Sequence, residues 1–286
     1  MNTDLTDICS LLACQISIPT VRNNKQKFDH IDFMIEKISQ RLDQRHADLV
    51  VLPELCTVEY SRETFQQLSE LAEGLQGRSV ERMRELAIKY RTSVIFGMPR
   101  SSKGRYFISQ LVIGPDGGLI SCYDKLHICQ YGASMEKDFF HPGGSLSVFS
   151  VAGFRFAPII CYDIRIPELS RTLALESKVD CILHCGAYYR DESFVTWHSF
   201  AITRAMENQL YLLSLNRAGE RYGDSVLCLP WMDEKQSEVH FSNHDEDFRY
   251  LKIERCRIAK ARHQYSFLKD RLNDYTSLPQ SNIQEY

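Results

Sequence analysis

The sequence has no apolar segment of the roughly 18 residues that a membrane-spanning helix needs, and it has no block of basic residues. The second absence, together with a formal net charge of -3, excludes the basic footprint of a nucleic-acid-binding domain. The N-terminal segment 1–17 lacks the basic stretch that opens a secretory signal peptide. We therefore expect a soluble, cytoplasmic protein that binds neither nucleic acid nor membrane.

No two of the ten cysteines have the Cys-x-x-Cys spacing typical of zinc and redox motifs. Cys181 and Cys185 flank His184, but the segment "DCILHCG" has the pattern of a strand, in which neighbouring side chains point to opposite faces. Several other cysteines lie within hydrophobic stretches, as reduced thiols of cytosolic proteins do. We expect free thiols, no bound metal and no cofactor.

What the chain does have is an alternation of apolar strand-like runs and amphipathic helices. Between Lys25 and His46, apolar residues recur at spacings of three and four, which predicts a helix. Further helices are predicted over 78–91, 167–177 and 197–209, and strands or hairpins over 10–17, 47–54, 92–100, 110–125, 154–161, 180–188, 210–216 and 224–241. This alternation, without a linker or repeat, predicts an α/β protein with mixed sheets and a single domain over 1–286.

Three of the predicted strands finish on a reactive side chain. "LVVLPEL" ends at Glu54, "LISCYDKLH" at Lys125 and "APIICYD" at Cys161. In layered α/β folds, ligand sites gather at strand ends, where loops leave the rigid sheet. Because each residue alone has an ordinary structural explanation, it is the combination that indicates a site.

The three side chains together have the chemistry for cysteine attack on a carbonyl. Such attack needs a nucleophile, a proton acceptor and a group that neutralises the oxyanion. The nine histidines are scattered and form no motif with a cysteine, but a partly desolvated carboxylate can act as the base. A lysine ammonium and the backbone N–H groups after Cys161 are suited to stabilising the negative charge.

The chain resembles the nitrilase superfamily of carbon–nitrogen hydrolases over almost its full length. Each short motif is weak alone, but six of them follow one another in the family's order. They are "DLVVLPEL" with Tyr60 beyond it, "YDKLHI" (123–128), "ICYDIRIPELSR" (160–171), "TWHSFAITRAMENQ" (196–209), "GDS" (223–225) and "FLKDRLNDY" (267–275).

The resemblance implies a four-layer α-β-β-α sandwich and assigns catalytic roles. Cys161 would attack, Glu54 would move the proton, and Lys125 would stabilise the tetrahedral intermediate. A second glutamate between lysine and cysteine, which orients the lysine or the substrate, would be Glu136 in "GASMEKDFFHPGG". Arg204 with Glu207 is interpreted as a structural ion pair or a dimer contact, and His127 receives no role.

Tyr60, Tyr162, Arg165 and Tyr188 are the candidates for contact with the substrate. Arg165, four residues past the nucleophile, is suited to pairing with a substrate carboxylate, or equally to a structural salt bridge. Two departures from the family pattern weaken any substrate assignment: Glu59 stands where the family often has glycine, and "PWMDEKQSEVHF" (230–241) replaces a more usual turn.

Within the family, Tyr162-Asp163 after the cysteine is typical of amidases, whereas nitrilases have Trp-Glu. We therefore expect hydrolysis of a small linear amide through a cysteine thioester, with release of ammonia. An N-carbamoyl amidohydrolase is the nearest alternative, a nitrilase a more distant one, and a catalytically inactive binding module the alternative of another class. The resemblance also implies a homodimer or higher homo-oligomer, packed through helices near 166–177 and 194–209.

Overall fold

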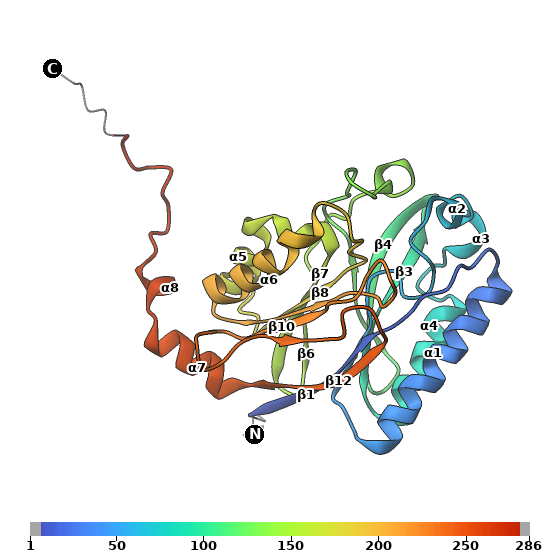
Figure 1. Ribbon diagram of the computed structural model, residues 1–286, viewed down its shortest axis with the longest axis horizontal. Coiled ribbons are helices and arrows are strands. Elements are labelled where there is room, and N and C mark those ends of the chain that lie inside the picture. The colour runs from blue at the N-terminus through green and yellow to red at the C-terminus, as the bar shows by residue number, and fades with distance from the viewer. Residues whose placement is uncertain (1–6, 281–286) are drawn as a thin grey trace.

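A computed structural model describes residues 7–280. The first six residues of the N-terminal segment 1–17, in which no signal peptide was expected, lie outside the described part. Two sheets stack face to face in the middle of the molecule, with helices covering the outer face of each (Figure 1). The four-layer α-β-β-α sandwich that the resemblance implied is therefore confirmed. Among residues 7–280, no helix combines the length and apolar character that crossing a membrane demands.

Both sheets have six strands and mix parallel with antiparallel neighbours. The first sheet has the order β12 (Asp247–Glu254), β1 (Ile8–Gln15), β2 (Leu49–Val51), β3 (Ser93–Ser102), β4 (Arg105–Ile113), β5 (Leu119–Asp124). The second has the order β11 (Val239–His240), β10 (Val226–Cys228), β9 (Tyr211–Leu215), β8 (Cys181–Cys185), β7 (Phe154–Ile160), β6 (Phe149–Val151). At the centre of each, three strands run parallel: β1, β2 and β3 in one, and β7, β8 and β9 in the other.

The longer helices cover the two outer faces. The first sheet is covered by α1 (Asn24–Gln44) and α4 (Arg78–Tyr90), and the second by α5 (Pro167–Leu175) and α6 (Phe194–Asn208). Asn23 begins α1 by accepting a hydrogen bond from the Gln26 N–H, and Pro167 begins α5 at a position where its missing N–H costs nothing. The remaining helices are α2 (Arg62–Phe65), α3 (Leu68–Leu71), α7 (Arg255–Gln264) and α8 (Phe267–Asp270), with 3₁₀ turns η1 (Glu136–Asp138) and η2 (Cys161–Arg165).

The alternation of side chains along each strand builds two kinds of core. Leu11, Leu183 and Leu213 point between the sheets, whereas Leu12 packs under α1 and α4, and Ile182 packs under α5 and α6. Because both faces of the central strands are buried, their sequences read as nearly continuous apolar runs. This is why the strands were recognisable in the sequence.

Most predicted elements are present, with two differences. The strand expected over 47–54 ends at Val51, because the chain turns at Pro53 and Leu55 has a φ of 47°. Among the described α-helices and β-strands, those that were not predicted are β12, α7 and the short β6, α2, α3 and α8. The hairpin expected over 224–241 is confirmed as the pairing of β10 with β11.

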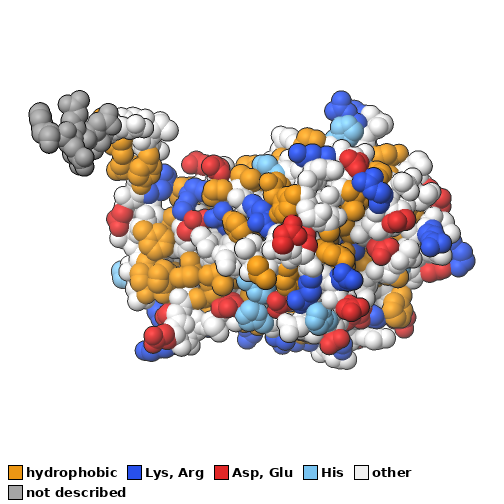
Figure 2. All heavy atoms as spheres, turned by 45° about the horizontal axis from the view of Figure 1, so that its top comes forward, with side chains coloured by type: hydrophobic (Ala, Val, Ile, Leu, Met, Phe, Trp, Pro, Cys, Tyr) orange, Lys and Arg blue, Asp and Glu red, His pale blue; other side chains and the backbone are white. Residues whose placement is uncertain are grey.

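One face of the surface is shown in Figure 2, where Lys, Arg, Asp and Glu side chains are interspersed and no single sign of charge dominates. This distribution agrees with the net charge of -3 and gives that face no anionic or cationic footprint.

Gly97 on β3 lies directly beneath the turn that carries Glu54. A Cβ at this position would meet the Pro53 carbonyl oxygen and the Leu55 nitrogen at 2.5 Å, so the turn can lie against the strand only where there is no side chain. The glycine is therefore part of what holds Glu54 in place.

We predict that Gly97→Ala lowers the free energy of unfolding by about 1–3 kcal/mol, because the backbone of the turn must move away from β3. Gly144→Ala is the matched control, since no atom lies within 4 Å of a Cβ at that position. Urea unfolding of both variants checks this, and equal stability of the two would contradict the argument.

Candidate active site

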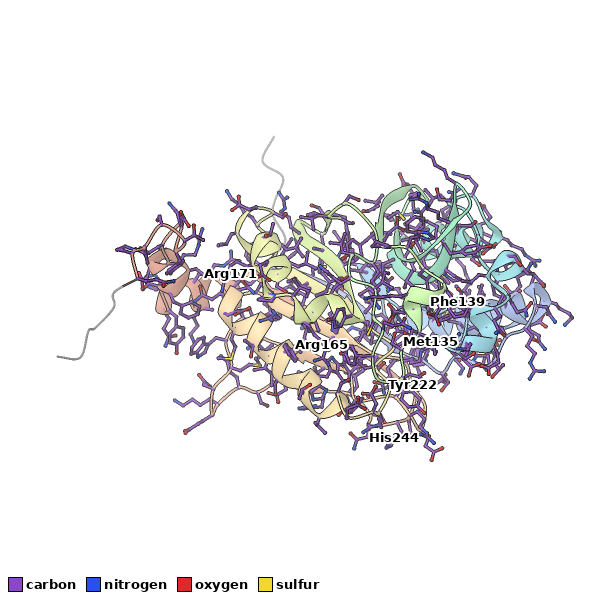
Figure 3. The ribbon with its side chains drawn as sticks, turned by 90° about the horizontal axis from the view of Figure 1, so that it is seen from above. Met135, Phe139, Arg165, Arg171, Tyr222 and His244 are labelled. Carbon is purple, nitrogen blue, oxygen red and sulfur yellow. The ribbon has the colours of Figure 1, made fainter. Side chains whose placement is uncertain are left out.

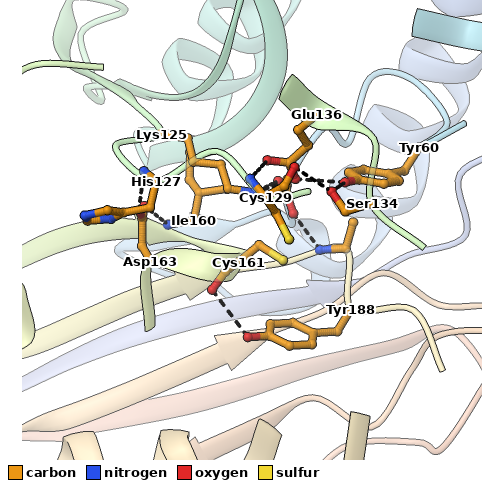
Figure 4. A network of polar contacts seen from close by, with 12 residues as sticks. Tyr60, Lys125, His127, Cys129, Ser134, Glu136, Ile160, Cys161, Asp163 and Tyr188 are labelled. Atoms are coloured by element: carbon orange, nitrogen blue, oxygen red, sulfur yellow. Dashed lines mark hydrogen bonds and ion pairs between the residues drawn. The ribbon is translucent and has the colours of Figure 1, made fainter. Parts of the chain in front are cut away.

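The side chains predicted from three strand ends lie together at one end of the sandwich. Glu54 follows β2 and Lys125 follows β5 of the first sheet, whereas Cys161 follows β7 of the second. Glu136, from η1, joins them (Figure 4). The site therefore lies across the two sheets, and neither sheet alone provides it.

Lys125 lies between two carboxylates in a fully buried cluster. Its Nζ is 3.0 Å from Glu54 Oε1 and 2.6 Å from Glu136 Oε1, and all three side chains are inaccessible to solvent. The other oxygen of each carboxylate accepts a backbone N–H, from Ala187 for Glu54 (2.8 Å) and from Cys129 for Glu136 (2.9 Å). These bonds offset the cost of burying the charges.

The nucleophile candidate lies on a tight turn between strand and helix. Cys161 has a φ of 46°, in the left-handed region that residues with a side chain seldom occupy. Its carbonyl oxygen accepts hydrogen bonds from His184 Nε2 (2.9 Å) and from the Tyr188 hydroxyl (3.4 Å). Such a strained turn is typical of a functional position, because it exposes both a side chain and free N–H groups.

Burial and the neighbouring charges set the protonation states. Burial raises the pKa of Glu54, and the opposing effect of Lys125 does not cancel it. Burial alone would lower the pKa of Lys125, but Glu136 and Glu54 raise it well above its ordinary value. Burial, then Glu54, raises the pKa of the Cys161 thiol, and Lys125 offsets this only in part. The thiol therefore resists ionisation, the lysine holds its proton, and Glu54 takes up a proton more readily than an ordinary glutamate.

Asp163 ties the lysine and cysteine segments together, a role that the sequence interpretation did not assign. Its Oδ1 accepts a hydrogen bond from the backbone N–H of His127 (3.0 Å) and lies 2.7 Å from Nδ1 of the same residue. Its Oδ2 accepts hydrogen bonds from the Tyr123 hydroxyl (2.7 Å) and the Ile160 N–H (3.0 Å). Because Asp163 is fully buried and satisfied on both oxygens, it fixes the spacing between the two segments.

Arg217 performs a similar task for the glutamate segment. This buried guanidinium donates from Nη2 to the carbonyl oxygens of Glu54 (3.4 Å), Leu55 (3.3 Å) and Val58 (3.3 Å). Neither Arg217 nor the Ala187 N–H was predicted. A backbone donor has no residue-type signal, and Arg217 lies 163 positions from Glu54.

A small cavity of about 40 Å³ opens onto Cys161. Its described lining includes carboxylates and tyrosines but no lysine or arginine, and the full set is Tyr60, Cys129, Tyr131, Ala133, Ser134, Glu136, Cys161, Tyr162, Ala187, Tyr188, Tyr189, Asp191 and Ser193. Three of the four substrate-contact candidates, Tyr60, Tyr162 and Tyr188, are therefore at the cavity. Tyr60 also donates to Glu136 Oε1 at 2.8 Å.

Arg165, the fourth candidate, does not line the cavity. Its guanidinium lies over the rings of Tyr131 (5.5 Å) and Phe200 (4.9 Å), and Figure 3 shows it beside α5 and α6. Tyr131 lines the cavity and contacts this cation, whereas Arg165 itself is not among the lining residues. Arg204 with Glu207 is the ion pair that was expected, at 2.9 Å.

Among residues 7–280, one group of side chains outside this site has the chemistry of metal ligands. His198, Asp224 and His240 each place one ligand atom within 4.8 Å of the others. However, His198 Nε2, the ring nitrogen that lies 3.8 Å from Asp224 Oδ2, is also 2.7 Å from the Asp224 carbonyl oxygen, which can only accept, so this nitrogen carries a proton and is not free to bind a metal. We assign no metal to this cluster.

Comparison with known proteins identifies the family. The model of the carbon-nitrogen hydrolase family matches residues 12–244, so the chain belongs to this family, as the motifs predicted, and it is an enzyme. An omega-amidase NIT2 of Xenopus tropicalis is 28% identical over 259 residues, covering 85% of this chain and 89% of the relative. An (R)-stereoselective amidase of Pseudomonas sp. is 29% identical over 210 residues, covering 72% of this chain and 73% of the relative.

The fold is shared with solved structures of the same superfamily. The crystal structure of Saccharomyces cerevisiae Nit3 superimposes with a TM-score of 0.81 and covers 96% of this chain and 98% of its own, although only 21% of the residues are identical. At that identity the likeness concerns the fold alone.

We predict that Glu54→Gln shifts the alkylation of Cys161 by iodoacetamide to lower pH. The substitution removes a negative charge that raises the thiol pKa and leaves the positive charge of Lys125, so thiolate forms more readily. The rate of alkylation, followed by mass spectrometry of the Cys161 peptide between pH 6 and 10, checks this. Cys161→Ala gives the background from the other nine cysteines. If the pH midpoint of Cys161 alkylation in Glu54→Gln equals or exceeds that of wild type, the charge arrangement is contradicted.

Proposed function

We propose that the protein hydrolyses the C–N bond of a small, uncharged linear amide through a thioester on Cys161, releasing ammonia. The observation that carries the proposal is the buried cluster of Glu54, Lys125 and Glu136, which holds a carboxylate of raised pKa and an ammonium beside a neutral thiol. The amidase relatives support the same class of reaction.

In the first half of the reaction, Cys161 Sγ attacks the amide carbon while Glu54 takes the thiol proton. The carbonyl oxygen becomes an oxyanion, which Lys125 Nζ and the Tyr162 N–H stabilise. Glu54 then gives its proton to the leaving nitrogen, the C–N bond breaks, and ammonia departs. Because proton transfer accompanies attack, a resting thiolate is not required.

In the second half, water replaces the amine. Glu54, again a carboxylate, takes a proton from water as the oxygen attacks the thioester carbon. It returns this proton to Cys161 Sγ as the C–S bond breaks, which gives the acid and the free thiol. Glu136 holds Lys125 in place through both halves, since it contacts the ammonium at 2.6 Å and is itself fixed by Tyr60 and the Cys129 N–H.

The cavity limits the substrate by size and by charge. Its volume of about 40 Å³ is only a few times the roughly 10–15 Å³ that a cavity needs to hold one water molecule, so a short acyl chain fits best. A substrate carboxylate would face Asp191, and the described lining offers it no lysine or arginine. Lys125 is paired with Glu54 and Glu136 and is not among the lining residues. A neutral amide such as butyramide should therefore be preferred over anionic succinamate.

We also infer a homodimer that packs α5 and α6 of two copies about a two-fold axis, which rests on the family resemblance. Val195 on α6 is 83% exposed, so a second copy packed against this helix would remove its side chain from water. Light scattering should give about twice the chain mass of 33.2 kDa, and Val195→Glu should shift the particle toward the monomer. A wild-type particle of 33.2 kDa at all micromolar concentrations would contradict the dimer.

We predict that the wild-type protein releases ammonia from short neutral amides and that Cys161→Ala abolishes this. Glu54→Gln and Lys125→Ala should each lower kcat by roughly a hundredfold or more, because they remove the base and an oxyanion partner. A coupled ammonia assay on acetamide, butyramide, succinamate, an N-carbamoyl amine and a nitrile checks the reaction class. Mass spectrometry of quenched enzyme should find the acyl group on Cys161.

Matched controls are the exposed residues Cys256→Ala, Glu234→Gln and Lys235→Ala, which should retain full activity. An active Cys161→Ala variant would overturn the mechanism. Faster release from the N-carbamoyl amine or the nitrile would move the protein to that reaction class, and no release from any compound would refute hydrolysis.

A further inference from the structure

His184 is a buried histidine behind the nucleophile that the proposed mechanism does not use. It lies on β8, beside Ile159 of β7 and Ser214 of β9, with its side chain toward α6. Its Nε2 is 2.9 Å from the Cys161 carbonyl oxygen and its Nδ1 is 2.6 Å from Ser214 Oγ, and Trp197 Nε1 on α6 is 2.7 Å from the same Oγ. His184, Ser214 and Trp197 are fully buried.

The groups at the two ends of this series of hydrogen bonds, the Trp197 indole and the Cys161 carbonyl, determine where its hydrogens lie. A carbonyl oxygen can only accept, so His184 Nε2 carries a proton and donates to Cys161. The indole N–H can only donate, so Ser214 Oγ accepts from Trp197 and is left with its own hydrogen to give to His184 Nδ1. Burial also lowers the pKa of His184 to about 4, so the imidazole is neutral near pH 7.

The bond to the Cys161 carbonyl determines where the next N–H points. In a trans peptide, the C=O and the following N–H point in opposite directions. The Cys161 carbonyl is held toward His184 on the α6 side of the sheet, so the Tyr162 N–H of the same peptide points the other way. As part of the first turn of η2, that N–H has no carbonyl of the same turn to bind.

We propose that His184, held in its Nε2–H form by Ser214 and Trp197, is a positioning residue that aims the Tyr162 N–H as an oxyanion donor. It touches neither substrate nor reacting atoms and acts through the peptide between Cys161 and Tyr162. The role rests on the proposed attack by Cys161. Without this bond, the Cys161 carbonyl keeps only the longer bond from the Tyr188 hydroxyl (3.4 Å), and the strained left-handed backbone of Cys161 would relax.

The test uses two substitutions of nearly equal shape. His184→Gln keeps an N–H donor for the Cys161 carbonyl, whereas His184→Met has the same length and no donor. Loss of a whole oxyanion donor lowers kcat by about 100- to 1,000-fold. In His184→Met the Tyr162 N–H is still present but no longer correctly oriented, so kcat should fall by roughly 10- to 100-fold with KM little changed. His184→Gln should recover most of this loss.

Two further measurements separate positioning from general damage. Alkylation of Cys161 by iodoacetamide forms no oxyanion, so its rate should be the same within about twofold in wild type and both variants. Butyraldehyde adds the thiol S–H across its C=O, so that sulfur bonds carbon and the oxygen gains the proton. The hydroxyl oxygen of this adduct occupies the position proposed for the oxyanion. The adduct should therefore be weaker in His184→Met than in wild type, and unchanged in His184→Gln.

Nitrogen NMR of the wild-type imidazole should show the neutral Nε2–H form from pH 8 to about pH 5. Another form, equal kcat in the Met and Gln variants, or a parallel loss of alkylation would each overturn the proposal. If His184→Met does not fold, Ser214→Ala takes its place, since it removes the donor to Nδ1. Should wild type hydrolyse no amide, the proposed function fails, and the aldehyde adduct still decides the role of His184.

Discussion

The structure of the site depends on one buried charge arrangement, the Lys125 ammonium between the carboxylates of Glu54 and Glu136. Three ionisable groups without access to water are tolerated only if each is paired and hydrogen-bonded. The Ala187 and Cys129 N–H groups and the Tyr60 hydroxyl provide the remaining bonds. The loops that carry these donors are therefore fixed by the charges.

The same arrangement accounts for the reactivity that we propose. One ammonium does not fully neutralise two carboxylates, so burial and the surplus negative charge raise the pKa of both Glu54 and Cys161. A thiol that resists ionisation lies beside a carboxylate that readily takes a proton. The proton can then move from Cys161 to Glu54 during attack, while the developing oxyanion interacts with Lys125. The net negative charge of the site therefore does not increase.

A second layer of bonds holds the backbone on which these groups stand. Asp163 joins the lysine and cysteine segments, Arg217 holds the turn after Glu54, and His184 holds the carbonyl of Cys161. Each is a polar side chain buried within otherwise apolar surroundings, where a satisfied network is rigid and a broken one is costly. Positions that carry strain, such as the left-handed Cys161, depend on that rigidity.

The sequence by itself determined the local elements and the ends of the reactive strands. Apolar runs and spacings of three and four specified strands and helices. The ends of three strands predicted Glu54, Lys125 and Cys161 as site residues, and the family resemblance added Glu136, because these signals lie in residue types at short separation. Only the tertiary structure decided which groups complete the site. Its partners are backbone N–H groups, such as that of Ala187, 133 positions from Glu54, and a backbone donor leaves no mark in the residue type. Packing likewise placed Arg165 over the ring of Tyr131 and His184 against the carbonyl of Cys161, since the direction of a side chain depends on neighbours that are distant in the chain.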